Sequence, residues 1–162
     1  MSSIEERLRR IEVQIQQLSD VEAVRKNLAE YCKAVDTKNI DLLASLFSQD
    51  MDLSVSPWSF EFHGRDAIID FYTKAFLDTD GSRHNCVNEV IESSADGGYK
   101  SSCYFHSTIA IGPESLVGWG NYDDTFVLED GVLKFKKKVI TVMVLTPLKA
   151  GWAGPDKIMS VH

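Results

Sequence analysis

The feature that most constrains the fold is a set of three long strand-like segments at the end of the sequence. They cover 99–111, 116–128 and 132–145 and are rich in β-branched and aromatic residues. Gly112-Pro113 separates the first two segments, and Glu129-Asp130-Gly131 separates the last two. Because connections this short join neighbouring antiparallel strands, the segments predict an antiparallel meander that forms most of one sheet.

The beginning of the sequence has the pattern of a helix. Apolar residues recur there at spacings of four and three, which is typical of a heptad-like seam. These residues are Ile4, Leu8, Ile11, Ile15 and Leu18. Two heptads are too short for an independent coiled coil, so we expect the N-terminal helix, 1–18, to pack on its own domain or on a neighbouring subunit. Ser19 and Glu22 indicate a capping box that restarts the helix, which then runs to about Asp36.

Short elements separate this helix from the long strands. We expect a short helix at about 40–47, a hairpin over 51–62, a third helix over 67–77 and a strand over 84–91. Helices come first and long strands come last, without a regular alternation of the two. This order predicts an α+β fold in which a curved antiparallel sheet packs against the N-terminal helices.

Composition and length narrow the function. The chain has 162 residues, which fits a single domain over 1–162, and its formal net charge of −7 argues against nucleic-acid binding. The one dense basic run, 134–138, is typical of a solvated strand face. The sequence has no apolar run long enough for a membrane span, and its charged N-terminus is unlike a signal peptide. The segment 147–162 is expected to lie over an opening or an interface.

The cysteines and the motifs that bind metals or nucleotides indicate whether the protein needs a cofactor. Cys32, Cys86 and Cys103 stand in apolar contexts without CxxC spacing. They predict free thiols in a reducing, cytoplasmic environment and no zinc site. The sequence has no phosphate-binding loop, dinucleotide fingerprint or HExxH motif. We therefore expect neither a metal nor another cofactor.

Polar side chains gather where the first long helix is expected to end. Tyr31 and Asp36 are five positions apart, about 140° round a helix axis, and a polar turn follows at 37–39. Asp36 has two interpretations. It either caps the next short helix through a backbone N–H, or points inward and orients a histidine from elsewhere. Helix geometry by itself leaves both open.

Several motifs, in this order, resemble the SnoaL-like branch of the nuclear transport factor 2-like superfamily. They are Tyr31-Cys-Lys-Ala-Val-Asp36, Asp41-Leu-Leu, Leu46-Phe47, Phe62-His-Gly-Arg-Asp-Ala-Ile68, His84 and Asn121-Tyr-Asp-Asp124. The resemblance covers nearly the whole chain and implies a cystatin-like cone, a curved sheet around helices enclosing a deep, mostly apolar pocket. The chain is most similar to cofactor-free lyases of the bile acid 7α-dehydratase, scytalone dehydratase and hexachlorocyclohexane dehydrochlorinase types.

The resemblance also implies site residues. Asp36 matches the aspartate that orients a histidine, and His84 matches the histidine that removes the substrate proton. Tyr31 matches a tyrosine of the bile acid enzyme, and Tyr122 matches a pocket tyrosine that can hydrogen-bond a substrate oxygen. His106 lies where the scytalone enzyme has a second pocket histidine.

Two further residues have two interpretations each, and one position on the final strand departs from the family. Trp58 either packs within the hairpin or forms a wall of the pocket. Asp124 shares a strand face with Tyr122 and is either a pocket acid or a structural link between strands. The arginine that the bile acid enzyme has on its final strand is replaced here, with lysines at 136–138 as possible substitutes.

These residue types can supply the groups that an elimination reaction requires. An imidazole accepts a C–H proton when its other nitrogen donates to a carboxylate, and phenols can assist the leaving group. We therefore expect a cofactor-independent dehydratase acting on a hydrophobic polyketide-, steroid- or ring-like molecule, in a homo-oligomer (trimer or dimer). One alternative is a ketone isomerase or cyclase of the same fold. Another is a non-catalytic ligand-binding or assembly subunit.

Overall fold

The computed structural model describes residues 3–153 and residue 158. Along the chain lie α1 (Ile4–Asp36), α2 (Ile40–Leu46), β1 (Phe47–Ser56), β2 (Phe60–His63), α3 (Arg65–Leu77), β3 (Gly81–Ser93), β4 (Tyr99–Ile111), β5 (Glu114–Glu129), β6 (Val132–Pro147) and the short 3-10 helix η1 (Leu148–Ala150). The predicted α+β order, with helices first and long strands last, is confirmed.

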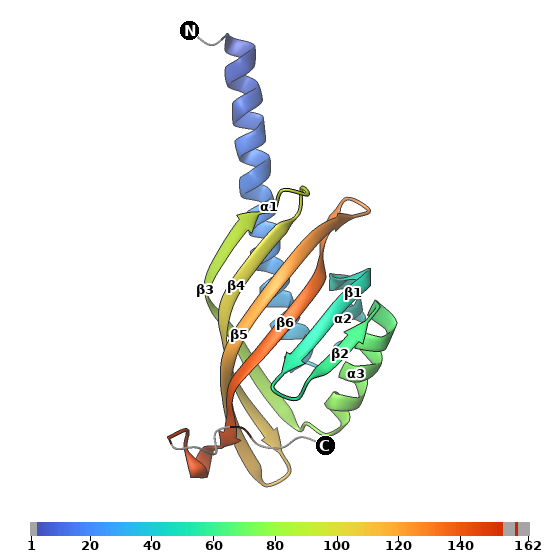
Figure 1. Cartoon of the computed structure of the whole chain (residues 1–162), viewed down its shortest axis with the longest axis vertical. Coiled ribbons are helices and arrows are strands. Elements are labelled where there is room, and N and C mark those ends of the chain that lie inside the picture. Colours follow the sequence, from blue (N-terminus) through green and yellow to red (C-terminus); the bar gives the residue numbers. More distant parts are fainter. Residues whose placement is uncertain (1–2, 154–157, 159–162) are drawn as a thin grey trace.

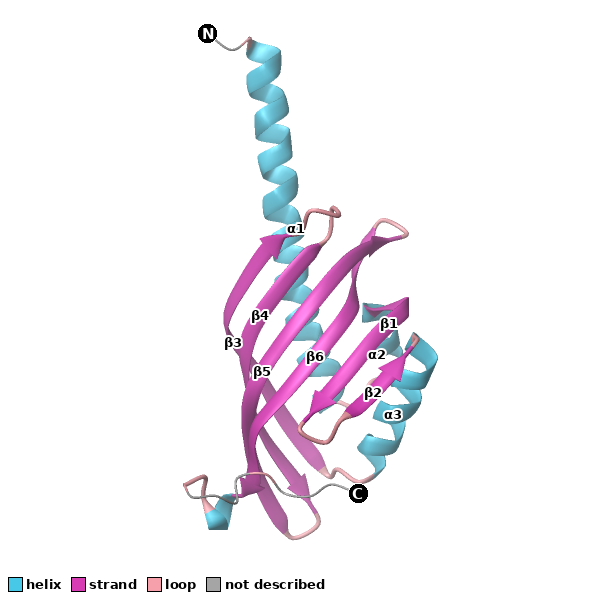
Figure 2. Cartoon of the chain, in the orientation of Figure 1, coloured by secondary structure: helices cyan, strands magenta, loops and turns pink. Residues whose placement is uncertain are grey.

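The strands form one curved, unclosed sheet in the order β2-β1-β6-β5-β4-β3 (Figure 2). Strands β3 to β6 make the predicted antiparallel meander. The expectation of a wholly antiparallel sheet is wrong, because β1 pairs with β6 in parallel. These two strands are far apart in sequence and are not joined by a hairpin, so nothing forces them to run in opposite directions.

The helices cover one face of this sheet (Figure 1). Alternate side chains of β4, including Tyr99, Cys103 and Phe105, point into the core, while their neighbours face solvent. The second half of α1 packs against the same core through residues such as Val24 and Leu28. Curvature of the sheet around this helix brings the end of α1 beside the beginning of β3, the sheet's edge strand.

Helix α1 is continuous, so the expected restart at Ser19 is wrong. The capping box lies instead at Ser3, whose hydroxyl accepts from the Glu6 N–H while the Glu6 carboxylate accepts from the Ser3 N–H. Residues 4–36 contain neither proline nor glycine, so nothing in the sequence interrupts the helix.

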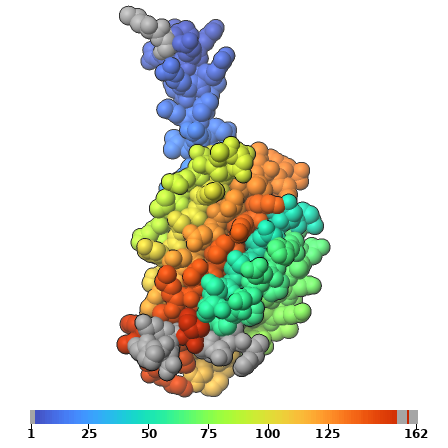
Figure 3. All heavy atoms as spheres, viewed as in Figure 1, coloured from blue at the N-terminus to red at the C-terminus, as the bar shows by residue number. Residues whose placement is uncertain are grey.

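The first part of α1 projects beyond the sheet as a stalk, which we define as residues 4–18 (Figures 1 and 3). All five of its seam residues are exposed. The expectation that the seam packs on its own domain is therefore wrong, which leaves the expectation of a neighbouring subunit.

Two further features concern the chain ends and membranes. Half of the tail lies outside the described residues (154–157 and 159–162), so its expected position is not observed beyond η1 and a parallel bridge between Leu145 and Ile158. Among the described residues, no helix combines the length and the apolar character needed to cross a bilayer.

Candidate active site

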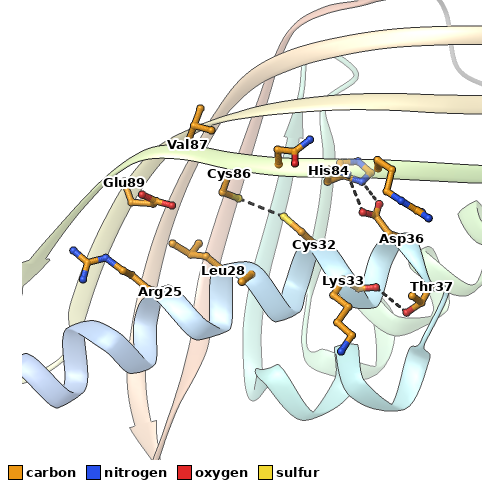
Figure 4. Close-up of a pocket in the computed structure, with 13 residues that line it drawn as sticks. Arg25, Leu28, Cys32, Lys33, Asp36, Thr37, His84, Cys86, Val87 and Glu89 are labelled. Atoms are coloured by element: carbon orange, nitrogen blue, oxygen red, sulfur yellow. Dashed lines mark hydrogen bonds and ion pairs between the residues drawn. The ribbon is translucent and has the colours of Figure 1, made fainter.

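The Asp36 carboxylate sits at the last position of α1 and does not cap the next helix. Asn39 takes that role, since its side chain accepts a hydrogen bond from the Leu42 N–H at 2.9 Å. The capping interpretation of Asp36 is therefore wrong. Its carboxylate turns towards the beginning of β3, as Figure 4 shows.

There it accepts three hydrogen bonds from β3. The His84 ring donates through Nδ1 to Oδ1 at 2.7 Å, and the His84 backbone N–H donates to Oδ2 at 2.9 Å. The Ser82 hydroxyl donates to Oδ1 at 3.0 Å. With its proton on Nδ1, the neutral ring keeps Nε2 unprotonated and able to accept a proton.

Burial and hydrogen bonding shift the pKa of the Asp36 carboxyl in opposite directions. Its side chain is only 10% exposed, and this burial raises the carboxyl pKa. The hydrogen bonds from the His84 ring, the His84 backbone and Ser82 lower the pKa and prevail, leaving it below the ordinary value of 3.8. Asp36 is therefore a carboxylate at neutral pH and can stabilise an imidazolium on His84.

This pair lines a cleft of about 460 Å³ between the second half of α1 and the edge strand β3 (Figure 4). Its apolar walls include Leu28, Ala29 and Val87, and Cys32 and Cys86 lie between them and the Asp36–His84 pair. The rest of the lining is polar or charged: Arg25, Lys33, Thr37, Arg83, Asn85 and Glu89. The cleft is thus mixed in character, whereas a mostly apolar pocket was expected.

Tyr31 and Tyr122 are not among the residues that line this cleft. They meet edge to face in the core, with ring centroids 5.7 Å apart, and each is at most 3% exposed. The Tyr31 hydroxyl lies 2.7 Å from that of Tyr72, and the Tyr122 ring stacks on Phe105. Burial raises the pKa of both phenols, which keeps them neutral. The structure corrects the expectation that they reach the pocket, because their rings fill the centre of the cone.

A buried ion pair beside these tyrosines is the feature that sequence reasoning missed. Lys138 Nζ lies 3.1 Å and 3.2 Å from the two carboxylate oxygens of Asp124. Both side chains are fully buried. The ammonium also lies 3.8 Å from the centroid of the Tyr122 ring and 4.1 Å from that of Tyr31. Asp124 therefore links the neighbouring strands β5 and β6 on the inner face of the sheet and is not a cleft acid.

A β-bulge explains why Lys138 is buried, although the basic run 134–138 predicts a solvated strand face. Phe135 faces the core, and simple alternation would then bury residue 137 and expose residue 138. The register with β5 shifts between Thr125 and Phe126, which leaves Lys136 as an extra residue on β6. The side chains from Lys137 to Val142 change face at that point, before a second register shift opposite Trp119 and Gly120, so Lys138 turns inward.

The three cysteines are free thiols, as expected, and two of them, Cys32 and Cys86, line the cleft. The sulfur atoms of Cys32 and Cys86 are 3.4 Å apart. Hydrogen bonds from the Cys103 and Cys32 thiols, assisted by the charge of Lys138, lower the pKa of the Cys86 thiol. Within the described residues, no group of three or more His, Cys, Asp and Glu side chains is arranged to hold a metal ion.

The remaining two candidates lie away from the cleft. His106 is exposed on the outer face of β4, with its ring 6.3 Å from that of Trp119. Its expected place in the pocket is wrong, because Phe105 next to it takes the inward position. Trp58 is half-buried in the turn between β1 and β2, where it stacks on Phe60.

Comparisons with known proteins agree with this architecture. Residues 16–139 match the family model of the SnoaL-like domain, a range that includes Asp36 and His84. No curated protein matches the chain in sequence.

Solved structures give the same fold. A candidate scytalone dehydratase from Novosphingobium aromaticivorans superposes with a TM-score of 0.76 at 24% identity, covering 83% of this chain and 91% of its own. The hexachlorocyclohexane dehydrochlorinase LinA-type3 from Novosphingobium barchaimii reaches 0.77 at 20% identity, covering 88% and 99%. Identities this low show a shared fold.

The buried pair leads to a prediction about stability. Asp124→Asn leaves the Lys138 ammonium buried without a counter-ion. Lys138→Met likewise leaves the Asp124 carboxylate buried without a counter-ion. We expect each single substitution to lower the free energy of unfolding by about 3–5 kcal/mol and the double substitution to recover most of that loss. Urea unfolding of the four proteins measures the coupling. Additive losses in the double variant would show that the two charges do not stabilise one another.

Proposed function

The chain belongs to the SnoaL-like domain family, and we propose that it is a cofactor-independent lyase of the dehydratase type. The observation that carries the proposal is the 2.7 Å hydrogen bond between His84 Nδ1 and Asp36 Oδ1 at the wall of a cleft. The fold shared with a candidate scytalone dehydratase and with a dehydrochlorinase supports a lyase-type or related activity.

In the proposed reaction, His84 Nε2 removes a proton from the carbon next to a substrate carbonyl. The electron pair of the broken C–H bond forms a C=C bond as the C–O bond to a neighbouring hydroxyl breaks. The imidazolium gives its proton to the departing oxygen, so water leaves and His84 returns to its neutral form. The Asp36 carboxylate stabilises the intermediate imidazolium and holds the ring in position.

The cleft lining supports a substrate with two kinds of surface. Leu28, Ala29 and Val87 can contact an apolar ring. Arg25, Lys33 and Arg83 line the same cleft, although the whole chain carries a net charge of −7. Two acidic groups, Asp36 and Glu89, also line the cleft, so three basic groups face two acidic ones. This small excess of positive charge favours a ring-bearing hydroxy-ketone that also carries an anionic group, such as a carboxylate.

Two other functions are compatible with the fold. A ketone isomerase or cyclase would share the proton removal by His84 but retain the hydroxyl. A non-catalytic binding or assembly subunit is favoured by one observation, the filling of the cone's interior by Tyr31, Tyr72 and Tyr122. A screen of hydroxy-ketones that follows both loss of water and exchange of the carbon-bound proton with solvent distinguishes all three.

The first prediction of this proposal concerns the pair itself. We expect Asp36→Asn and His84→Gln each to lower kcat by about 10²–10⁴-fold, because either change removes the oriented base. The chain offers a matched control, since His63 Nδ1 also lies 2.7 Å from a carboxylate oxygen, that of Asp52, on the exposed surface. His63→Gln should leave kcat unchanged. Equal losses in the cleft and surface variants would contradict the assignment.

A second prediction concerns pH. The rate should fall as the pH is lowered, since Nε2 must be unprotonated to accept the substrate proton. The lowered pKa of Asp36 keeps its carboxylate ionised as the pH falls below neutral, so the acid limb should report a single proton that is not bound by Asp36. The dependence of kcat/KM on pH tests this. An acid limb that involves two protons, or a rate that increases towards low pH, would be inconsistent with the proposed roles.

A third prediction concerns the basic lining. For a substrate with a carboxylate, Lys33→Gln should raise KM about 2- to 5-fold with little change in kcat, as for the loss of one partly exposed ion pair. Lys26→Gln serves as the control, because Lys26 lies on the same helix but does not line the cleft. An identical effect of both substitutions, or none from Lys33→Gln, would argue against an anionic substrate.

A further inference from the structure

The stalk of α1 carries a surface that the proposed reaction does not use. Its seam residues are between 49% and 75% exposed in the single chain. They are Ile4, Leu8, Ile11, Ile15 and Leu18, and they recur at the 4-3-4-3 spacing of a coiled coil. A helix of this length is marginal in water without packing. An exposed apolar stripe with this spacing is typical of a surface that packs against another helix.

The direction of the seam shows where a partner can approach. At 100° per residue, the seam lies about 150° round the helix axis from the α1 residues buried against the sheet, such as Val24, Leu28 and Tyr31. The stripe is thus not a continuation of the core face. Stalks from several chains can meet along their seams while each body stays on the outside.

The heptad positions favour copies of the same chain. Leu8 and Ile15 take position a, so Arg7 falls at position g, and Glu5 and Glu12 fall at position e. In a parallel, in-register pair, Arg7 of one stalk lies opposite Glu12 of the next, which gives an attractive contact. An antiparallel pair would instead place position e against position e, glutamate against glutamate. Charge complementarity therefore selects the parallel arrangement.

From these observations we infer that copies of this chain associate through the stalk as a parallel, in-register coiled coil. Isoleucine at the d positions 4 and 11 favours three strands over two. The seam ends at Leu18, and the cleft lining begins at Arg25, so the association is independent of the proposed chemistry. Only two heptads pair, which makes the assembly dependent on protein concentration.

Sedimentation over a range of concentrations tests the inference. The full chain should reach three times its mass of 18.2 kDa at high concentration. Ile11→Lys should shift it to the monomer, whereas Val13→Lys, a matched substitution at an exposed residue on the opposite side of the stalk, should not. A wild-type monomer at every concentration, or an oligomer that Ile11→Lys leaves intact, would overturn the inference.

The charge pairs and a cross-link test the orientation. Arg7→Glu should weaken the association, and the charge swap Arg7→Glu with Glu12→Arg should restore it, which a general loss of helix stability would not do. Under mild oxidation, Leu8→Cys should form a disulfide between chains, because parallel register brings the copies of residue 8 together at one level of the coiled coil. The wild-type protein, oxidised in the same way, controls for disulfides formed by the three native cysteines. Failure of both restoration and cross-linking would overturn the parallel arrangement.

Discussion

The hydrogen bonds between Asp36 and the beginning of β3 connect the two parts on which the structure depends. One part is the helix that fills the sheet's concave face, and the other is the strand that ends the sheet. Two of the three bonds come from the backbone and a serine, so the carboxylate is fixed even before the His84 ring binds it. The ring is then held with one nitrogen committed to Asp36 and the other available for chemistry.

The chain contains two buried pairs of ionisable side chains, and they differ in their access to solvent. Asp36 and His84 lie at the cleft, where a proton can enter and leave. Lys138 and Asp124 are fully enclosed among aromatic rings and have no such access. Burial raises the pKa of Asp124 to about 6 although Lys138 acts to lower it, which shows how strongly this site is shielded from water. Only the first pair can therefore exchange protons with a bound molecule, as the proposed function requires, whereas the second lies entirely within the core.

The sequence predicted what depends on local pattern and on the order of motifs. The meander followed from strand length and turn residues, and the pairing of Asp36 with His84 followed from family resemblance. Prediction from the sequence failed where tertiary structure overrides periodicity. A single bulged residue, Lys136, changes which side chains of β6 face the core and buries Lys138. The same limit applies to His106, whose side of the sheet no motif specifies, and to the parallel pairing of β1 with β6, which joins strands far apart in the sequence.

The central claim is that Asp36 holds His84 as a neutral imidazole with its proton on Nδ1. The direct measurement is a ¹H–¹⁵N NMR correlation spectrum of the histidine rings at neutral pH, with the His84 signals assigned by their loss in His84→Gln. The account predicts a protonated Nδ1 and an unprotonated Nε2, and a change in this pattern in Asp36→Asn. A His84 ring with its proton on Nε2, or one insensitive to Asp36→Asn, would contradict the account.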